Sequence, residues 1–184
     1  SEVEKLIEEV RRSSEEVERR IKKLNDDVRR STEKVEEDIR RLNEELKKIL
    51  DEVAKEMERR DKEEVKRIIE EVEKRVKEVH DRSREIAERN KKRIDDVHRE
   101  SARIAEENKE ELDKVLKRVR ELPVDERIVR RVEKIIRDLK KRSDELLKED
   151  RRSAEEAKRE TDRLVEEDKR SVDEIRERLK ELSR

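Results

Sequence analysis

The sequence predicts an all-α protein: a long, nearly straight, antiparallel three-helix bundle, coiled-coil-like and built on an 18-residue layer repeat. Three observations lead to this prediction. Charged residues make up 61% of the 184 residues, with no Gly and only one Pro. Apolar residues recur every three or four positions, which places them on one face of a helix. Consecutive 18-residue segments repeat one another. A disordered chain would favour Pro and Gly and would not need this periodicity.

The first helix is expected over residues 2–59. Its apolar stripe runs from Val3 to Met57 in steps that are mostly of three and four residues. Ser1 followed by Glu4 has the form of a capping box, in which the hydroxyl and the carboxylate satisfy free backbone amides at a helix start. Residues with high helix propensity fill the other positions. The sequence therefore predicts one uninterrupted helix here.

The second helix is expected over residues 62–121, with a stripe from Val65 to Val119. Asp61 can act as its N-cap, with Glu64 at the third helical position. No Gly marks the end of the preceding helix, and the stripe keeps its phase across the gap. The alternative is therefore one continuous helix of about 120 residues. We favour a turn near residue 60, because breaks near 60 and 122 divide the chain into three nearly equal helices.

The third helix is expected over residues 124–183. Pro123 has no backbone donor and disfavours helical geometry at Leu122, so a break at this point is firm. A proline is also well suited to the first turn of the helix that follows. The three helices are expected to form a single domain over residues 1–184.

Repeated segments define the layers of the bundle. The segment VHDRSREIAERNKKRIDD at 79–96 is followed by VHRESARIAEENKEELDK at 97–114, and each of the other two helices carries a similar pair. At 3.6 residues per turn, a repeat of 18 residues is five whole turns. The apolar stripe then returns to the same side of the helix without supercoiling, whereas heptads impose a left-handed supercoil. The repeat therefore predicts nearly straight helices.

Polar residues interrupt the stripes at matching heights when the helices alternate in direction. We expect four buried polar layers, each with one central residue from the second helix. Two layers are centred on a histidine: Asn25–His98–Asp150 with Ser101 and Ser153 nearby, and Asn43–His80–Asp168 with Ser83 and Ser171 nearby. Two are centred on an asparagine: Ser14–Asn108–Ser143 and Thr32–Asn90–Thr161.

Such layers have a physical use. A buried polar group without a partner costs about 1–3 kcal/mol, so it is tolerated only within a satisfied network. These networks penalise wrong registers and wrong partners more than they add stability. In the histidine layers, a carboxylate on one ring nitrogen would fix the tautomer and leave the other nitrogen to accept a hydrogen bond.

The chain resembles de novo designed helical bundles with built-in hydrogen-bond networks. The features that carry the resemblance are the exact 18-residue layers, the Glu/Lys/Arg-rich surface, the lack of aromatic residues, and isolated Asn, Ser, His and Asp within apolar stripes. The resemblance covers the whole chain. It implies a structural scaffold with no natural biochemical activity, no cofactor, no required partner and no natural cellular location. A soluble protein compatible with cytoplasmic expression is expected.

The sequence indicates no catalytic, cofactor-binding or metal site. Ser101, His98 and Asp150 are the residue types of a hydrolase triad, but long helices without Gly satisfy their own amides and offer no oxyanion hole. One His and one Asp in a layer fall short of the three or more ligands that zinc requires. The residue types of these layers therefore indicate a structural role.

Partners are restricted by the charge pattern. The 56 basic and 57 acidic residues alternate along the chain, so no basic block is available to follow a phosphate backbone, and no aromatic side chain can stack on a base. No apolar run is long enough to span a membrane, and no signal peptide is visible. The alternative function is a subunit of a designed homo- or hetero-oligomer, because narrow stripes could also accept a fourth helix from a partner or another copy. Such a subunit could respond to pH through His80 and His98.

Overall fold

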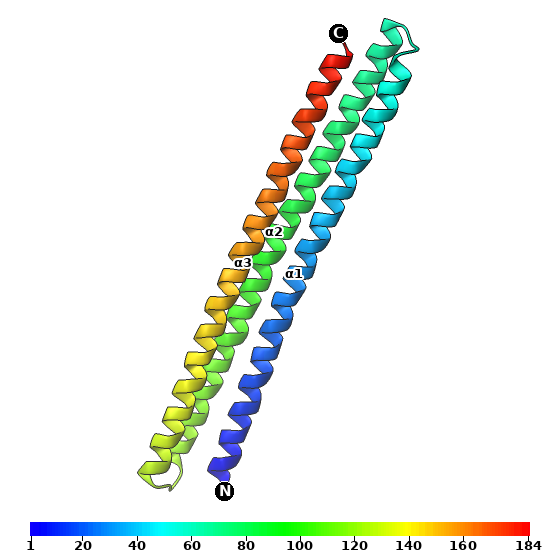
Figure 1. Cartoon of the computed structure of the whole chain (residues 1–184). Coiled ribbons are helices and arrows are strands. Elements are labelled where there is room, and N and C mark those ends of the chain that lie inside the picture. Colours follow the sequence, from blue (N-terminus) through cyan, green and yellow to red (C-terminus); the bar gives the residue numbers. More distant parts are fainter. The chain divides into compact units, whose positions relative to one another are not determined.

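The computed structural model describes residues 1–184 and contains three α-helices and no strand. They are α1 (Glu2–Met57), α2 (Lys62–Glu121) and α3 (Glu126–Leu182) (Figure 1). Each helix is uninterrupted, and no peptide bond is cis and no residue has positive φ. The helix ends lie within two residues of the predicted ones.

Both predicted N-caps of α1 and α2 are confirmed. The backbone amide of Glu4 donates to the hydroxyl of Ser1 at 3.3 Å. The amide of Glu64 donates to a carboxylate oxygen of Asp61 at 2.9 Å. In each case the cap satisfies one of the amides that the first turn of a helix leaves without a partner. These two short side chains therefore set where the helices begin.

The turn between α1 and α2 is real and occupies residues 58–61, so the alternative of one continuous helix is wrong. It forms without glycine because no residue needs a left-handed conformation. The chain instead tightens through hydrogen bonds from the amide of Arg59 to the carbonyl of Glu56 and from Arg60 to Met57. These bonds span three residues and satisfy carbonyls that the last turn would leave free.

The connection between α2 and α3 corrects one prediction. Pro123 was expected in the first turn of the third helix, but it lies before that helix, in the connection. The amide of Val124 donates to the carbonyl of Leu122 at 2.8 Å, which closes a three-residue turn around the proline. α3 begins after Asp125, whose carboxylate accepts a hydrogen bond from the amide of Arg127 at 3.1 Å. The cap at Asp125 therefore determines the start of α3.

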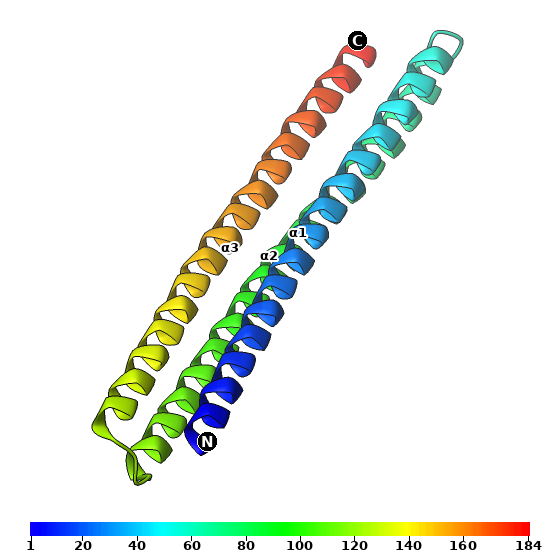
Figure 2. The same ribbon diagram turned by 60° about the horizontal axis from the view of Figure 1, so that its bottom comes forward.

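The contacts divide the chain into two compact units. Unit 1 comprises residues 1–29 and 94–156, and unit 2 comprises residues 30–93 and 157–184, so each unit has one segment of every helix. Within each unit α2 runs antiparallel to α1 and α3, as the ribbon shows from two directions (Figures 1 and 2). The all-α, antiparallel three-helix fold class is therefore confirmed.

The core of unit 1 is aliphatic. One cluster fills the part of the unit next to the α2–α3 connection, where all three helices contribute Val, Leu and Ile side chains. Its buried members are Val3, Leu6, Ile7, Val10, Leu112, Val119, Val132 and Ile136. A smaller cluster contains Ile21, Ile104 and Ala105. The removal of these side chains from water stabilises the unit by roughly 25 cal/mol for each Å² of apolar surface.

The core of unit 2 has the same character. Its larger cluster lies next to the α1–α2 turn, and its buried members are Leu46, Leu50, Val72, Val76, Val79, Val172, Ile175 and Leu179. A smaller cluster contains Val35, Ile39 and Leu164. In both units the predicted stripes thus face one another, and the polar positions between the apolar clusters are buried or partly buried.

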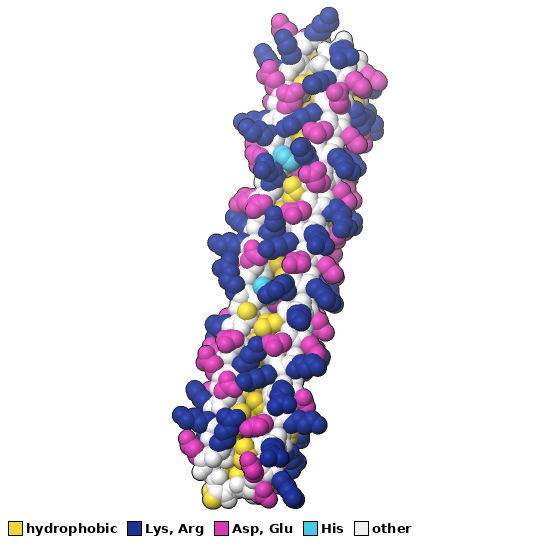
Figure 3. Space-filling model, turned by 90° about the vertical axis from the view of Figure 1, so that its left-hand side faces the viewer, with side chains coloured by type: hydrophobic (Ala, Val, Ile, Leu, Met, Phe, Trp, Pro, Cys, Tyr) yellow, Lys and Arg dark blue, Asp and Glu magenta, His cyan; other side chains and the backbone are white.

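The surface is densely charged. Figure 3 shows Lys and Arg side chains interspersed with Asp and Glu over the face that it presents, with only narrow lines of hydrophobic atoms between them. Ile128 is the one exposed large hydrophobic residue, at 38% exposure. None of the helices combines the length and the apolar character that crossing a membrane requires. The apolar surface is therefore used almost entirely between the three helices.

Candidate functional site

The polar layer of unit 2 that is centred on Asn90 joins all three helices. The side-chain amide of Asn90 donates to the hydroxyl oxygens of Thr32 and Thr161, each at 3.1 Å. The hydroxyl of Ser31 donates to Oδ1 of Asn90 at 2.6 Å. Thr161 donates its own proton to the carbonyl of Ala157 at 2.8 Å, so its lone pairs are available to Asn90. The Asn90 amide thus uses both of its donor hydrogens and one acceptor position.

Sequence reasoning missed Ser31. The signal was available, because a serine precedes the layer residue of α1 in both repeats: Ser31 before Thr32, and Ser13 before Ser14. Only Ser31 is partly buried, whereas Ser13 is exposed. The sequence pattern could therefore have suggested the residue type but not which copy contributes to a layer.

The equivalent layer of unit 1 is less complete. The amide of Asn108 donates to the hydroxyl of Ser14 at 3.4 Å, which is a long hydrogen bond. The predicted third member, Ser143, is 4% exposed, but its hydroxyl has no partner in the protein. Oδ1 of Asn108 is likewise buried without a partner. The structure therefore brings the three residues to one place and bonds only two of them.

The histidine layer of unit 1 brings three predicted residues together. Nδ1 of His98 on α2 lies 2.5 Å from Oδ2 of Asp150 on α3. Burial raises the pKa of Asp150 above its ordinary value of 3.8. The hydrogen bond and charge of His98 lower this pKa but do not cancel the effect of burial, and Asn25 and Ser101, which face the same carboxylate, lower it less. Ser101 makes no hydrogen bond of normal geometry there, because its Oγ is buried without a partner.

The histidine layer of unit 2 differs in its third member. Nδ1 of His80 lies 2.9 Å from Oδ2 of Asp168, which is fully buried. Asn43 was expected to join this pair, but its Oδ1 is buried without a partner and no hydrogen bond links it to His80 or Asp168. The other carboxylate oxygen of Asp168 also has none. The hydrogen bond of this layer therefore joins only His80 and Asp168.

The four serines predicted near the histidines do not extend these layers. Ser83 and Ser101 on α2 are buried, at 1% and 0% exposure, and neither hydroxyl has a partner. Ser153 and Ser171 on α3 are only partly buried, and no hydrogen bond joins them to the serines of α2. A hydroxyl reaches less far than an amide or a carboxylate, so agreement in height alone does not produce a bond between two serines.

The arrangement of the polar groups in these layers is better suited to linking helices than to catalysis or ligand binding. Each imidazole is held by a buried carboxylate and has a side chain that is partly exposed, 27% for His98 and 17% for His80. No group of three or more His, Asp or Glu side chains converges as metal ligands do. A groove of unit 2, about 460 Å³, is lined by charged side chains of α2 and α3. An apolar pocket with converging polar groups, which ligand sites usually have, is not seen there.

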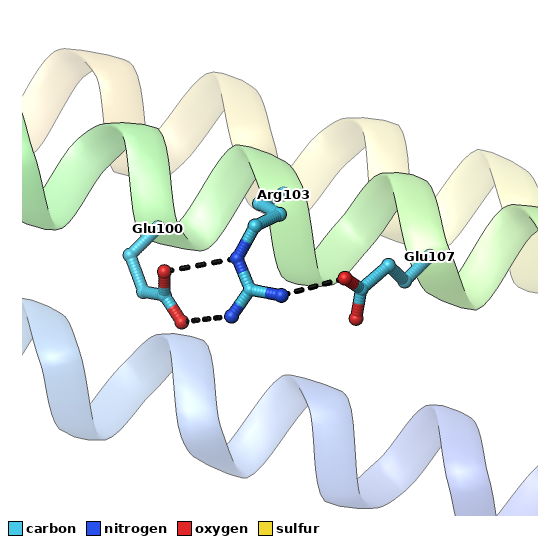
Figure 4. A network of polar contacts seen from close by, with 3 residues as sticks. All are labelled: Glu100, Arg103 and Glu107. Carbon is cyan, nitrogen blue, oxygen red and sulfur yellow. Dashed lines mark hydrogen bonds and ion pairs between the residues drawn. The ribbon is translucent and has the colours of Figure 1, made fainter.

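Charged side chains on the outside form pairs along and between helices. On α2, Arg103 donates from Nε to Glu100 at 3.0 Å and from Nη1 to Glu107 at 2.6 Å, and a further bond links Nη2 to Glu100 (Figure 4). The hydrogen bonds to Arg103 lower the pKa of Glu100. The carboxylates of Glu100 and Glu107 in turn raise the pKa of Arg103. Exposed groups of this kind favour the helix only slightly and are screened by salt.

Comparisons with known proteins agree with the fold. No family model matches the chain, and no curated protein matches it significantly. Among solved structures, the chain is similar to a computationally designed three-helix bundle, with a TM-score of 0.62 and 21% sequence identity. The similarity covers 99% of this chain and 86% of that chain. The fold is a three-helix bundle. At this identity the likeness establishes the fold alone.

Proposed function

We propose that the protein is a designed structural scaffold, without enzymatic activity, in which the buried polar layers specify how the helices pair. The observation that carries this proposal is the Asn90 layer. There, one amide of α2 binds hydroxyls of both α1 and α3, between clusters of aliphatic side chains. The repeats at a spacing of 18 residues and the similarity to a computationally designed bundle support a designed origin.

The layer would act by making displaced registers of the helices less stable than the observed register. In the observed register Asn90 satisfies three hydrogen-bonding positions, whereas a helix displaced by one turn would place the amide against apolar side chains such as Val35 or Leu164. An amide buried without partners costs about 1–3 kcal/mol, so each such layer disfavours the displaced arrangement. The aliphatic clusters alone would discriminate weakly, because similar side chains recur along every stripe.

The surface favours a scaffold over the alternative of an oligomer subunit. A subunit would need an apolar or polar-network face open to a partner helix. Ile128 is the one large hydrophobic residue that is exposed, and on the face that Figure 3 presents charged side chains flank the narrow lines of hydrophobic atoms. The stripes of each unit are thus occupied by the other two helices of the same unit.

The test replaces the three buried members of the layer by apolar residues of similar size, in the variant Thr32→Val/Asn90→Leu/Thr161→Val. We expect this variant to stay helical with an equal or higher denaturant midpoint, but to show extra NMR signals from alternative registers. The matched control, Thr32→Ser/Thr161→Ser, keeps hydroxyls at both positions and should show one set of signals. A single native-like set from the apolar variant would contradict the proposed role of the layer.

A second candidate role, a response to pH, is supported by the two His–Asp pairs. Each imidazole binds a buried carboxylate through Nδ1, so a proton added to the ring would change the charge of the pair inside the bundle. The test compares the wild type with His80→Gln/His98→Gln from neutral pH to about pH 5. A difference in melting temperature that changes with pH supports this role, and a constant difference excludes it.

A further inference from the structure

The two asparagine layers occupy equivalent positions in the repeat but satisfy their central amide differently. Asn90 and Asn108 are 18 residues apart on α2 and are both buried, at 3% and 5% exposure. Asn90 makes three side-chain hydrogen bonds of 2.6 to 3.1 Å. Asn108 makes one, of 3.4 Å. The same residue type in the same core environment is thus satisfied in unit 2 and only partly satisfied in unit 1.

A small cavity lies beside Asn108. Its volume is about 50 Å³, and its lining includes Ser14 of α1, Asn108 of α2, and Ser143 of α3 with Leu139 and Leu146. The charged side chains of Glu15, Glu18 and Arg142 line it as well. Two polar atoms of this lining, Oδ1 of Asn108 and Oγ of Ser143, are buried without a protein partner. The cavity therefore combines space with unsatisfied hydrogen-bonding groups.

The residue types of the two units account for this difference in part. Where unit 2 has Thr32 and Thr161, unit 1 has Ser14 and Ser143, so each position lacks one methyl group. A β-branched threonine is held in few rotamers, whereas serine is freer to turn its hydroxyl away. The loss of two methyl groups leaves space beside the amide, and the loss of restraint leaves the Asn108 layer with a single long hydrogen bond.

We propose that this cavity is a hydration site, which holds at least one ordered water molecule. The water donates one hydrogen to Oδ1 of Asn108 and accepts a hydrogen bond from Oγ of Ser143, with the hydroxyl of Ser14 within the same cavity as a further partner. A cavity needs roughly 10–15 Å³ to hold a water, and an ordered water needs two to four polar partners. The site meets both conditions, and it does not depend on the function proposed above.

Rearrangement of the protein alone does not remove the need for a water. The hydroxyl of Ser143 could rotate to donate to the carbonyl four residues earlier, that of Leu139, as Thr161 does with Ala157 in unit 2. This bond would satisfy Ser143. Oδ1 of Asn108 would remain a buried acceptor without a donor, which a structure seldom tolerates.

The experiment detects the water by NMR on the full-length protein with ¹⁵N-labelled side-chain amides. We expect a cross-relaxation signal between water and the Asn108 amide, with the sign of a long-lived contact, and none at Asn90. The variant Ser14→Thr/Ser143→Thr should abolish the signal at Asn108. The reciprocal variant, Thr32→Ser/Thr161→Ser, should create one at Asn90.

Two results would overturn the proposal: equal signals at Asn108 and Asn90 in the wild type, or a signal at Asn108 that survives in Ser14→Thr/Ser143→Thr. If that variant does not fold, a high-resolution crystal structure of the wild type decides. A water within hydrogen-bonding distance of both Oδ1 of Asn108 and Oγ of Ser143 supports the site. A dry cavity excludes it.

Discussion

Oδ2 of Asp150 lies 2.5 Å from Nδ1 of His98, and Asp150 is only 1% exposed. A carboxylate is thus removed from water and given an imidazole as its principal partner. Burial disfavours the charged form of the carboxylate more than the imidazole favours it, and the pKa of Asp150 is raised. The His98–Asp150 pair therefore links α2 and α3 of unit 1, but the burial of its charged carboxylate costs free energy.

The first prediction concerns this cost. Between the ordinary pKa of Asp150 and its raised pKa in the folded protein, the folded state holds a proton that the unfolded chain has released. The contribution of Asp150 to the free energy of unfolding therefore rises as pH falls through this window and is lowest above it. Asp150→Asn, which cannot ionise, should show its greatest stability relative to wild type near neutral pH, with a smaller advantage in acid.

The measurement is urea unfolding of both proteins over a series of pH values. Asp173→Asn serves as a control, because Asp173 is an exposed residue of the same helix. An advantage of Asp150→Asn that grows as pH falls would show that the pKa of Asp150 is lowered by folding rather than raised.

The second prediction compares the two asparagine layers. Asn90→Ala removes three hydrogen bonds, so we expect the free energy of unfolding to fall by about 1–3 kcal/mol or more. Asn108→Ala should cost clearly less, because Asn108 makes only one long hydrogen bond to the protein. Urea unfolding of the two variants measures the difference. Equal costs would mean that the layers are equally satisfied in solution.

The third prediction concerns the aliphatic core. Leu179 is completely buried in the core of unit 2, so Leu179→Ala should lower the free energy of unfolding by about 2–5 kcal/mol through lost contacts and the cavity that it leaves. Ile128→Ala at the exposed position should cost far less. Thermal and denaturant melts of the two variants would show this contrast, and similar losses would mean that Ile128 is covered in solution.

The fourth prediction concerns the start of α2. Asp61→Ala removes the acceptor for the amide of Glu64 and should cost about 1 kcal/mol. Asp61→Asn keeps a side-chain oxygen at the same place and should cost only a fraction of this. Hydrogen exchange of the amides in the first turn of α2 would report the local effect. Unchanged protection in Asp61→Ala would show that the cap does not hold this turn.

Periodic spacing and local capping were sufficient to predict the fold. The apolar stripes identify the three helices because burial on one side of a helix requires a 3.6-residue period. Asp61 identifies the start of α2 because its cap is a local interaction between residues close in sequence. The fold class was therefore available from the sequence, although Asp125 rather than Pro123 sets the start of α3.

The layers were predictable in their heights but not in their bonds. Numbering placed Asn43 level with His80 as well as it placed Asn25 level with His98, yet Oδ1 of Asn43 is buried without a partner. Height along a helix follows from the sequence. The rotamer and the last few ångströms between side chains depend on the packing of all three helices, which numbering does not contain.

The most direct test of the account is the mass of the protein in solution, measured by light scattering after size exclusion over a range of micromolar concentrations. If each chain's own three helices satisfy its apolar stripes and polar layers, the mass is that of one chain, 22.6 kDa, at every concentration. A mass of two or more chains that grows with concentration would contradict this, because the layers would then act between chains.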